Sequence, residues 1–353
     1  MSGRVLQSEY MYWAKNQAPV TYHLASSEVP HFRMDEWEID PAGLELDGAS
    51  RYRYPLLREA IARKTGVSPD RVVMADGTSM ANMLAMAGLI APGDDVLIEH
   101  PVYEPLVAAA RFLGAEVRHF SRHGPAFALD PDAVKMALTA RTTLIVLTNL
   151  HNPAGNLADT ETLRAIGALG PRILIDEVYL DAAPGERSAA LLGDAFVCTS
   201  SLTKVYGLSG LRCGWILAAP DLVERLWRLN ELFSVAQGHA TERLSLIALA
   251  RLDEVAADTP ALLARNRARA NAFFAGRDDL EVAPMVHNVT CFPRLKHGDV
   301  DALNARLRAA YGTSIVPGRF FGLADHFRMG IGNPTEIVEA GLERIGRALD
   351  ELS

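Results

Sequence analysis

The sequence predicts an α/β fold in which helices cover both faces of a mostly parallel sheet. Short apolar runs alternate with longer amphipathic runs between residues 71 and 218, a pattern typical of strands linked by helices. The short runs, such as "TTLIVLT" (142–148) and "RILID" (172–176), are almost continuously apolar, as in strands buried on both faces. A chain of 353 residues is also long enough for a large core and two lobes.

The elements of this sheet follow in order along the chain. A strand is predicted at "RVVMA" (71–75), before a helix from Thr78 to about Ile90, and another at "DVLIE" (95–99), before a helix near 103–113. Further strands are predicted at "AEVRHF" (115–120), 142–148, 172–176, "AFVCTS" (195–200) and "CGWILA" (213–218), with helices near 130–139 and 160–168 between them.

The pattern changes after about residue 220. Long helical stretches rich in Leu, Ala and Arg follow, such as "DLVERLWRLNELF" (221–233) and "PALLARNRARANAFFA" (260–275). Shorter strand-like pieces, "NVTCFPRL" (288–295) and "HFRMGIG" (326–332), then alternate with helices. We therefore expect a large domain over residues 46–230 and a smaller α+β domain built from residues 1–45 and 231–353.

Composition and charge narrow the function. Apolar residues make up 49% and charged residues 22%, and the net charge is 35 − 43 = −8, which argues against nucleic acid or an anionic membrane as the main partner. No apolar run reaches the length of a membrane span, and "MSGRVLQSEYMYWAK" lacks the apolar stretch of a secretion signal. Cys198, Cys213 and Cys291 form no C-x-x-C motif, so a cytoplasmic location is expected. His119 and His123 have no partner cluster, so no metal is predicted.

Polar residues follow the ends of successive predicted strands, which is where ligands bind in open α/β sheets. Gly77, Thr78 and Ser79 would open a helix whose free N–H groups suit a phosphate, although taken alone they also fit an ordinary N-cap. Asp176 ends an apolar strand, where a buried carboxylate needs a cationic partner unless it faces water.

The remaining strand ends add an aromatic, an amide and a basic set: Tyr103, Asn152, and Ser201 with Lys204 and Arg212. Lys204 is one of only five lysines against thirty arginines, and it follows an apolar run in a stretch with few other charges. It is either a surface loop residue or an amine kept for chemistry. One ligand would use the whole set, namely a pyridine ring that carries a phosphate, an aldehyde and a phenolic oxygen.

Four motifs then resemble one family. "NLHNPAG" (149–155), "DEVY" (176–179) and "SLTKVYGLSGLRCGW" (201–215) occur in the order and approximate spacing of the class I/II aminotransferases, which are fold-type-I pyridoxal-phosphate-dependent enzymes, and "HFRMGIG" (326–332) is similar to their carboxylate-binding arginine motif. The resemblance runs from about residue 50 to residue 332. It implies a large domain with a mostly parallel seven-stranded sheet, a smaller α+β domain, and pyridoxal 5′-phosphate as cofactor.

The resemblance also implies a role for each site residue. Lys204 would form the Schiff base with the cofactor aldehyde, and Asp176 would pair with the pyridine nitrogen, which makes the ring an electron sink. Asn152 and Tyr179 would bond the phenolic oxygen, and Tyr103 would stack on the ring.

Further roles concern the phosphate and the substrate. The 77–79 turn, Ser201 and Arg212 would hold the phosphate. Arg328 would bind the substrate α-carboxylate as a planar fork, with help from Asn152. In the family, a tyrosine also crosses a homodimer interface to the partner's phosphate, and Tyr52 is preferred here over Tyr54.

The N-terminal segments carry further expectations. The substrate loop, commonly glycine-rich in relatives, reads "LASSEVP", so Ser26 and Ser27 would narrow the pocket or add a hydroxyl. Tyr10, Tyr12 and Trp13 are expected to pack in the core rather than to cap the site.

These inferences predict an aminotransferase that moves an amino group between an α-amino acid and a 2-oxo acid. The alternative is a pyridoxal-phosphate-dependent lyase of the C–S β-eliminating type, because the same cofactor site serves both reactions. A non-catalytic regulator ranks last, since the chain carries no helix-turn-helix or basic segment.

Overall fold

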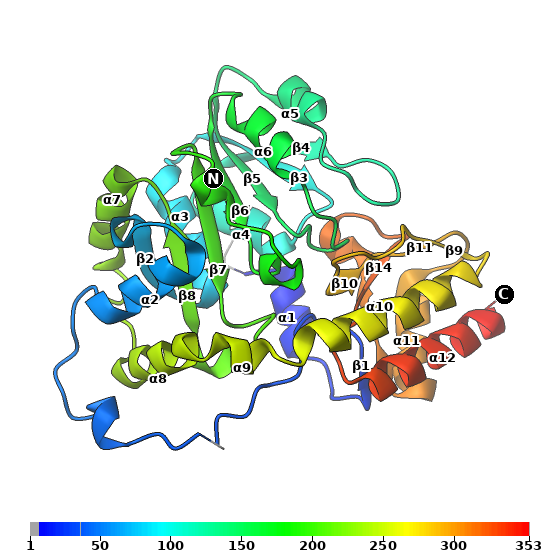
Figure 1. Cartoon of the computed structure of the whole chain (residues 1–353). Coiled ribbons are helices and arrows are strands. Elements are labelled where there is room, and N and C mark those ends of the chain that lie inside the picture. The colour runs from blue at the N-terminus through cyan, green and yellow to red at the C-terminus, as the bar shows by residue number, and fades with distance from the viewer. Residues whose placement is uncertain (1–6, 36, 353) are drawn as a thin grey trace.

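The computed structural model describes residues 7–35 and 37–352. Its centre is a seven-stranded sheet in the order β2-β8-β7-β6-β5-β3-β4, shown in Figure 1. The strands are β2 (Val72–Asp76), β3 (Asp95–His100), β4 (Glu116–Ser121), β5 (Thr142–Thr148), β6 (Arg172–Asp176), β7 (Phe196–Ser201) and β8 (Cys213–Leu217). β8 runs antiparallel to β2 and β7, and the other neighbouring pairs are parallel. The predicted fold class is confirmed.

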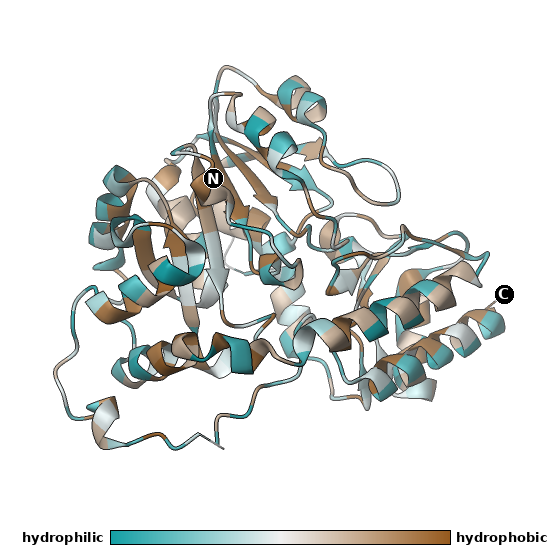
Figure 2. Ribbon diagram, in the orientation of Figure 1, coloured by the Kyte–Doolittle hydropathy of each residue, from teal (hydrophilic) through white to brown (hydrophobic). Residues whose placement is uncertain are grey.

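Helices flank this sheet on both sides (Figure 1). They are α2 (Pro55–Thr65), α3 (Gly77–Leu89), α4 (Glu104–Phe112), α5 (Pro131–Ala137), α6 (Thr160–Gly167) and α7 (Pro220–Asn230). The central strands are buried and mostly apolar, with polar residues at their ends, whereas the edge strand β4 alternates exposed polar residues with Phe120 in the core. Figure 2 shows the same contrast, with hydrophobic strands inside and hydrophilic helix surfaces outside. This layering follows from the hydrophobic effect acting on a two-sided sheet.

The C-terminal part is built from helices and short strands. The helices are α8 (His239–Ala250), α9 (Leu252–Ala256), α10 (Thr259–Ala275), α11 (Val300–Tyr311) and α12 (Thr335–Leu352). The strands are β9 (Leu280–Glu281), β10 (Thr290–Cys291), β11 (Arg294–Leu295), β12 (Thr313–Ser314), β13 (Val316–Pro317) and β14 (Phe327–Gly330). A separate hydrophobic cluster joins α10, α11 and α12 to Leu24. Ala248 and Val255 instead belong to the cluster of the large sheet, and the domain boundary at residue 230 stays a prediction.

The N-terminal segment connects the two parts. α1 (Glu9–Lys15) is followed by β1 (Tyr22–His23), which pairs with β12. The chain then runs past β14, where the Gly330 N–H donates to the Leu24 carbonyl at 2.7 Å, and past the loop after β7, where the Val29 N–H donates to the Lys204 carbonyl at 3.0 Å. Residues 24–29 are therefore held against the carboxyl-terminal edge of the large sheet.

None of the helices in the described part of the chain combines the length and the apolar character that crossing a membrane requires. Cys198, Cys213 and Cys291 are all buried and free.

Candidate active site

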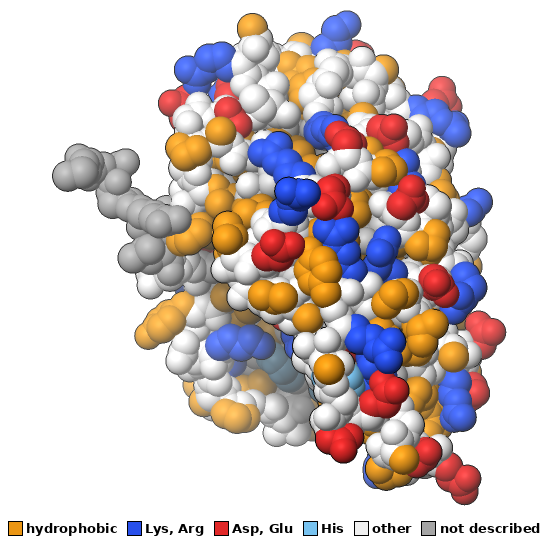
Figure 3. Space-filling view, turned by 90° about the vertical axis from the view of Figure 1, so that its left-hand side faces the viewer, with side chains coloured by type: hydrophobic (Ala, Val, Ile, Leu, Met, Phe, Trp, Pro, Cys, Tyr) orange, Lys and Arg blue, Asp and Glu red, His pale blue; other side chains and the backbone are white. Residues whose placement is uncertain are grey.

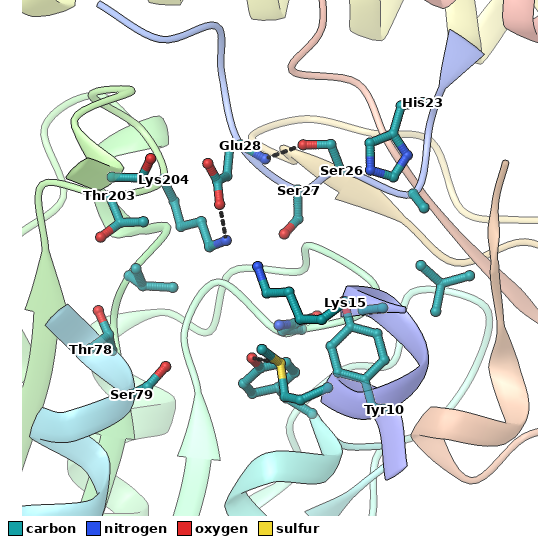
Figure 4. Close-up of a pocket in the computed structure, with 18 of the residues that line it drawn as sticks. Tyr10, Lys15, His23, Ser26, Ser27, Glu28, Thr78, Ser79, Thr203 and Lys204 are labelled. Carbon is teal, nitrogen blue, oxygen red and sulfur yellow. Dashed lines mark hydrogen bonds and ion pairs between the residues drawn. The ribbon is translucent and has the colours of Figure 1, made fainter. Parts of the chain in front are cut away.

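A cavity of about 890 Å³ lies where the carboxyl ends of the parallel strands meet α1 and residues 23–31. Figure 4 shows side chains from both sides directed into it. Most of the residues predicted from the sequence line this cavity: Ser26, Thr78, Ser79, Tyr103, Asn152, Asp176, Tyr179, Ser201, Lys204 and Arg212. The volume is in the range of small-molecule sites.

The start of α3 forms one end of the cavity. Its N-cap residue, Asp76, makes no side-chain capping bond, so N–H groups of the first turn stay available to a ligand. The Thr78 hydroxyl donates to the Ser201 hydroxyl at 2.8 Å, and that hydroxyl donates to Thr203 at 2.9 Å. Hydroxyls, backbone N–H groups and the positive end of the helix dipole together suit a phosphate.

Arg212 completes this end of the cavity. Its backbone is left-handed at φ 51°, and its carbonyl accepts the Gly77 N–H at 2.8 Å while its guanidinium donates to the Asp76 carbonyl at 3.1 Å. Gly77 has φ 75°, and a Cβ at this position would collide with the Arg212 guanidinium. A glycine is therefore needed for the arginine to lie beside the start of the helix.

Asp176 lies at the end of β6 and is only 5% exposed. Its carboxylate accepts from the Asn82 amide at 2.8 Å and from the Val178 N–H at 3.0 Å. Burial raises the pKa of Asp176 from 3.8 to about 6, against the lowering effect of both hydrogen bonds and of the Lys204 charge. Within the described residues this buried carboxylate forms no ion pair, so it lacks the cation that its position calls for.

The Lys204 amine enters the cavity from the loop after β7. It donates to the Glu28 carboxylate at 2.8 Å (Figure 4). Burial alone lowers the pKa of Lys204, but the neighbouring Tyr179 hydroxyl and Glu28 carboxylate outweigh burial and raise this pKa above its ordinary value.

Three further predicted residues lie around these groups. Tyr179 is buried, and desolvation raises its pKa although the Lys204 charge opposes this. Asn152 is held by its backbone, whose N–H donates to the Thr148 hydroxyl at 2.8 Å. Tyr103 is the N-cap residue of α4 and packs edge-on against Tyr10, with ring centroids 5.6 Å apart.

Arg328 lies on β14 and is 1% exposed. Its guanidinium donates to the Asn152 amide oxygen at 3.1 Å, the Tyr10 hydroxyl at 2.7 Å and the Ala25 carbonyl at 3.2 Å, and its Nε has no partner among the described residues. A buried cation whose bonds go only to neutral groups is suited to a carboxylate ligand.

Tyr52 lies apart from this cavity. It is 43% exposed, and it hydrogen-bonds Glu231 and packs edge-on against Trp227. Tyr54 is buried under the Arg243 guanidinium, 3.9 Å from its ring centroid. Of the two tyrosines, Tyr52 is the accessible one.

Sequence reasoning missed three residues of the site: Asn82, Glu28 and Tyr10. Asn82 had a signal, because it comes one turn after Thr78 and so lies on the same face of α3. Tyr10 and Trp13 pack in a core cluster, as expected, and the Tyr10 hydroxyl also bonds Arg328. The same expectation was wrong for Tyr12, which is 65% exposed. No local sequence pattern indicated that Glu28 would lie in the site.

These groups fit pyridoxal phosphate. The ring nitrogen would supply the cation that Asp176 lacks, and the phosphate would accept from Thr78, Ser79, Ser201 and Arg212. The aldehyde would meet the Lys204 amine.

Comparisons with known proteins agree with this fit. The family model "Aminotransferase class I and II" matches residues 23–345. Capreomycidine synthase of Streptomyces vinaceus is 34% identical over 348 residues, covering 92% of this chain and 89% of that protein. A histidinol-phosphate aminotransferase of Sphingopyxis alaskensis is 32% identical over 308 residues, covering 82% and 80%.

Solved structures share the fold. A PLP-dependent aminotransferase from Streptococcus suis superposes with a TM-score of 0.90 at 22% identity, covering 99% of each chain. A PLP-dependent cyclase superposes with a TM-score of 0.89 at 24% identity, covering 100% of this chain and 99% of that one. The family model and the relatives identify pyridoxal phosphate as the cofactor. The chain belongs to the class I and II aminotransferase family of pyridoxal-phosphate-dependent enzymes.

Proposed function

We propose that the enzyme transfers an amino group between an α-amino acid and a 2-oxo acid. The observation that carries the proposal is one cavity that brings together the Lys204 amine, the Asp176 carboxylate and the hydroxyl–arginine cluster at the start of α3, with Arg328 at its border. Pyridoxal phosphate supplies an electron sink that stabilises negative charge at the substrate α-carbon.

The chain's own residues would hold the cofactor and the substrate. Lys204 would bind the cofactor through its amine, and after release by the substrate the free amine would take and return a proton at the substrate α-carbon. Asp176 would keep the ring nitrogen protonated, because a carboxylate favours the neighbouring cation. Arg328 would bind the α-carboxylate, since its guanidinium is charged and prepositioned.

A half-reaction screen tests the proposal. Each amino acid is added to the cofactor-loaded protein, and the visible absorbance of the cofactor and the formation of 2-oxo acid are recorded. Lys204→Ala should lose the protein-bound absorbance band and all turnover. Lys64→Ala is the matched control, because Lys64 pairs with Asp181 and does not line the cavity. Near wild-type transfer by Lys204→Ala would overturn the assignment.

A second candidate is a reaction on the same cofactor without amino transfer, such as elimination. It is favoured by the relative that is 34% identical, whose name describes a synthase, and by the structural neighbour described as a cyclase. The same screen separates the two. Amino transfer converts the cofactor to its amine form and yields a 2-oxo acid, whereas elimination releases the leaving group and restores the cofactor.

We also propose that the working unit is a homodimer. Large apolar side chains are exposed on the segments beside α2 and after α7: Leu46, Tyr52, Leu56, Leu232, Phe233 and Val235. These segments are neighbours, because Tyr52 bonds Glu231 and Glu45 bonds Arg243. Figure 3 views the molecule from this side, where apolar and charged side chains intermingle. A second copy would cover this apolar surface and would receive Tyr52 at its phosphate.

Subunit mixing tests the shared site. Lys204→Ala subunits are exchanged with Tyr52→Phe subunits, after each variant has been shown to be impaired alone. Each hybrid dimer would then contain one site with neither defect, so activity should return. Failure to recover activity after proven exchange would place Tyr52 outside the partner's site.

A further inference from the structure

Residues 24–32 form a clamped segment that the fold holds at both sides. The Gly330 N–H donates to the Leu24 carbonyl at 2.7 Å on one side, and on the other the Val29 and Phe32 N–H groups donate to the carbonyls of Lys204 and Gly207 at 3.0 and 3.2 Å. A Cβ at Gly330 would collide with the Ser26 backbone, so β14 approaches the segment as closely as a glycine allows. The backbone of Glu28 is thus fixed against the loop that carries Lys204.

The side chain of Glu28 uses this position to reach the Lys204 amine. One carboxylate oxygen lies 2.8 Å from Nζ, and each side chain is about a quarter exposed, at 27% for Glu28 and 25% for Lys204. Figure 4 shows the pair at the upper wall of the cavity, across from Thr78 and Ser79. Glu28 therefore contacts the one atom of this chain that would both hold the cofactor and move a proton.

None of the other charged or titratable groups described around the Lys204 amine offers it a second carboxylate partner. Asp176 accepts from Asn82 and Val178, and burial raises the pKa of Tyr179, which is a neutral phenol at physiological pH. The Tyr10 hydroxyl accepts from Arg328. The remaining groups that line or border the cavity are cationic or neutral: Lys15, His23, His31, Tyr103, Arg212, Arg308 and Arg328. Cations disfavour a further ammonium. Among the described residues, Glu28 is the carboxylate that forms an ion pair with Lys204.

The geometry points to Glu28 as a further catalytic residue, the carboxylate that stabilises the ammonium form of Lys204. This inference rests on the proposed role of Lys204. When the amine takes a proton from the substrate α-carbon, its lone pair becomes the new N–H bond and the C–H electron pair stays with the substrate carbon. The positive charge that appears on Nζ lies within hydrogen-bond distance of the Glu28 carboxylate. The same contact holds the free amine protonated before it binds the cofactor.

The cofactor-free protein offers a direct test, because only a neutral amine can attack the aldehyde. Apoprotein is mixed with saturating pyridoxal 5′-phosphate, and the first-order rate of covalent capture is followed by absorbance between pH 6.5 and 8.5. While the amine is mostly protonated, the logarithm of this rate rises with pH. Glu28→Gln should place the line about tenfold higher, since losing a partly exposed, charge-assisted hydrogen bond lowers the pKa of the amine and increases its neutral fraction.

Three variants make the result specific. Glu28→Asp keeps the charge and should return the line toward wild type. Glu339→Gln removes a glutamate that pairs with Arg269 at 2.7 Å outside the cavity, and its line should coincide with wild type. Circular dichroism establishes that each variant is folded, and Glu28→Ser provides a second neutral side chain.

The outcomes separate the two proposals. If Lys204→Ala still captures the cofactor covalently, the proposed function fails and the role of Glu28 falls with it. If capture needs Lys204 but the Glu28→Gln and Glu28→Ser lines coincide with wild type, only the role of Glu28 is refuted. An equal rise in Glu339→Gln would also refute it. A tenfold rise confined to the neutral Glu28 variants supports it.

Discussion

The buried carboxylate of Asp176 should destabilise the cofactor-free protein at neutral pH. Its pKa is raised from 3.8 to about 6 by burial, so between these values the folded state binds a proton that the unfolded state has lost. This carboxylate therefore costs no stability below pH 3.8, and its destabilising contribution grows as the pH rises through 6. The rise of this pKa from 3.8 to about 6 corresponds to a loss of about 3 kcal/mol in unfolding free energy over the whole window, of which roughly 2 kcal/mol falls between pH 4.5 and 7.5. At 5% exposure, solvent screening removes little of this effect.

Asp176→Asn removes this dependence. The amide cannot ionise, although its NH₂ group meets the donors of Asn82 or Val178 and causes a pH-independent loss of stability. The informative quantity is therefore the difference in unfolding free energy, wild type minus variant, measured by urea unfolding of the apoproteins at several pH values. Trp215 in β8 and Trp227 in α7, both buried, report the transition by fluorescence. The difference should fall by about 2 kcal/mol from pH 4.5 to 7.5.

Saturating pyridoxal phosphate is the control. Its ring nitrogen would supply the missing cation, so the cofactor should stabilise wild type more than Asp176→Asn at pH 7.5. Parallel stability curves for the two apoproteins across the pH range would refute the reasoning, because Asp176 would then be ionised and satisfied without a ligand.

Three other predictions concern the phosphate and carboxylate ends of the site. Gly77→Ala should weaken cofactor binding at least tenfold in a fluorescence titration, because a left-handed alanine costs roughly 1–2 kcal/mol and its Cβ collides with Arg212. Gly93→Ala is the control for backbone strain alone, because Gly93 has φ 89° and open space around it. Equal losses of cofactor binding in the two variants would contradict the clash. Arg328→Ala should raise the KM for the amino acid roughly 100-fold, since a charge-assisted fork contributes a few kcal/mol to binding. The absorbance spectrum of the bound cofactor should stay unchanged. An altered spectrum with an unchanged KM would exclude the role of Arg328 in binding the carboxylate. Tyr10→Phe should raise KM about tenfold with kcat near wild type in steady-state assays, because Arg328 loses a 2.7 Å acceptor; an unchanged KM would show that Tyr10 only packs.

The sequence by itself determined the sheet and the part of the site that belongs to it. The parallel strands end at one edge, so residues just after them must meet there whatever the rest of the chain does. That rule brings Thr78, Tyr103, Asn152, Asp176 and Lys204 to one cavity. The motifs that carry these residues, in their order along the chain, were sufficient to show the resemblance to the class I/II aminotransferases.

Only the tertiary structure decided what covers this edge. Glu28 meets Lys204 across 176 positions, and Tyr10 meets Arg328 across 318. Local periodicity reports which face of an element is buried, but it carries no information on which distant segment packs against that face. The path of residues 24–32 between β14 and the loop after β7 depends on close backbone approaches, such as the one at Gly330. A glutamate in "LASSEVP" therefore becomes the neighbour of the lysine through the packing of the whole chain.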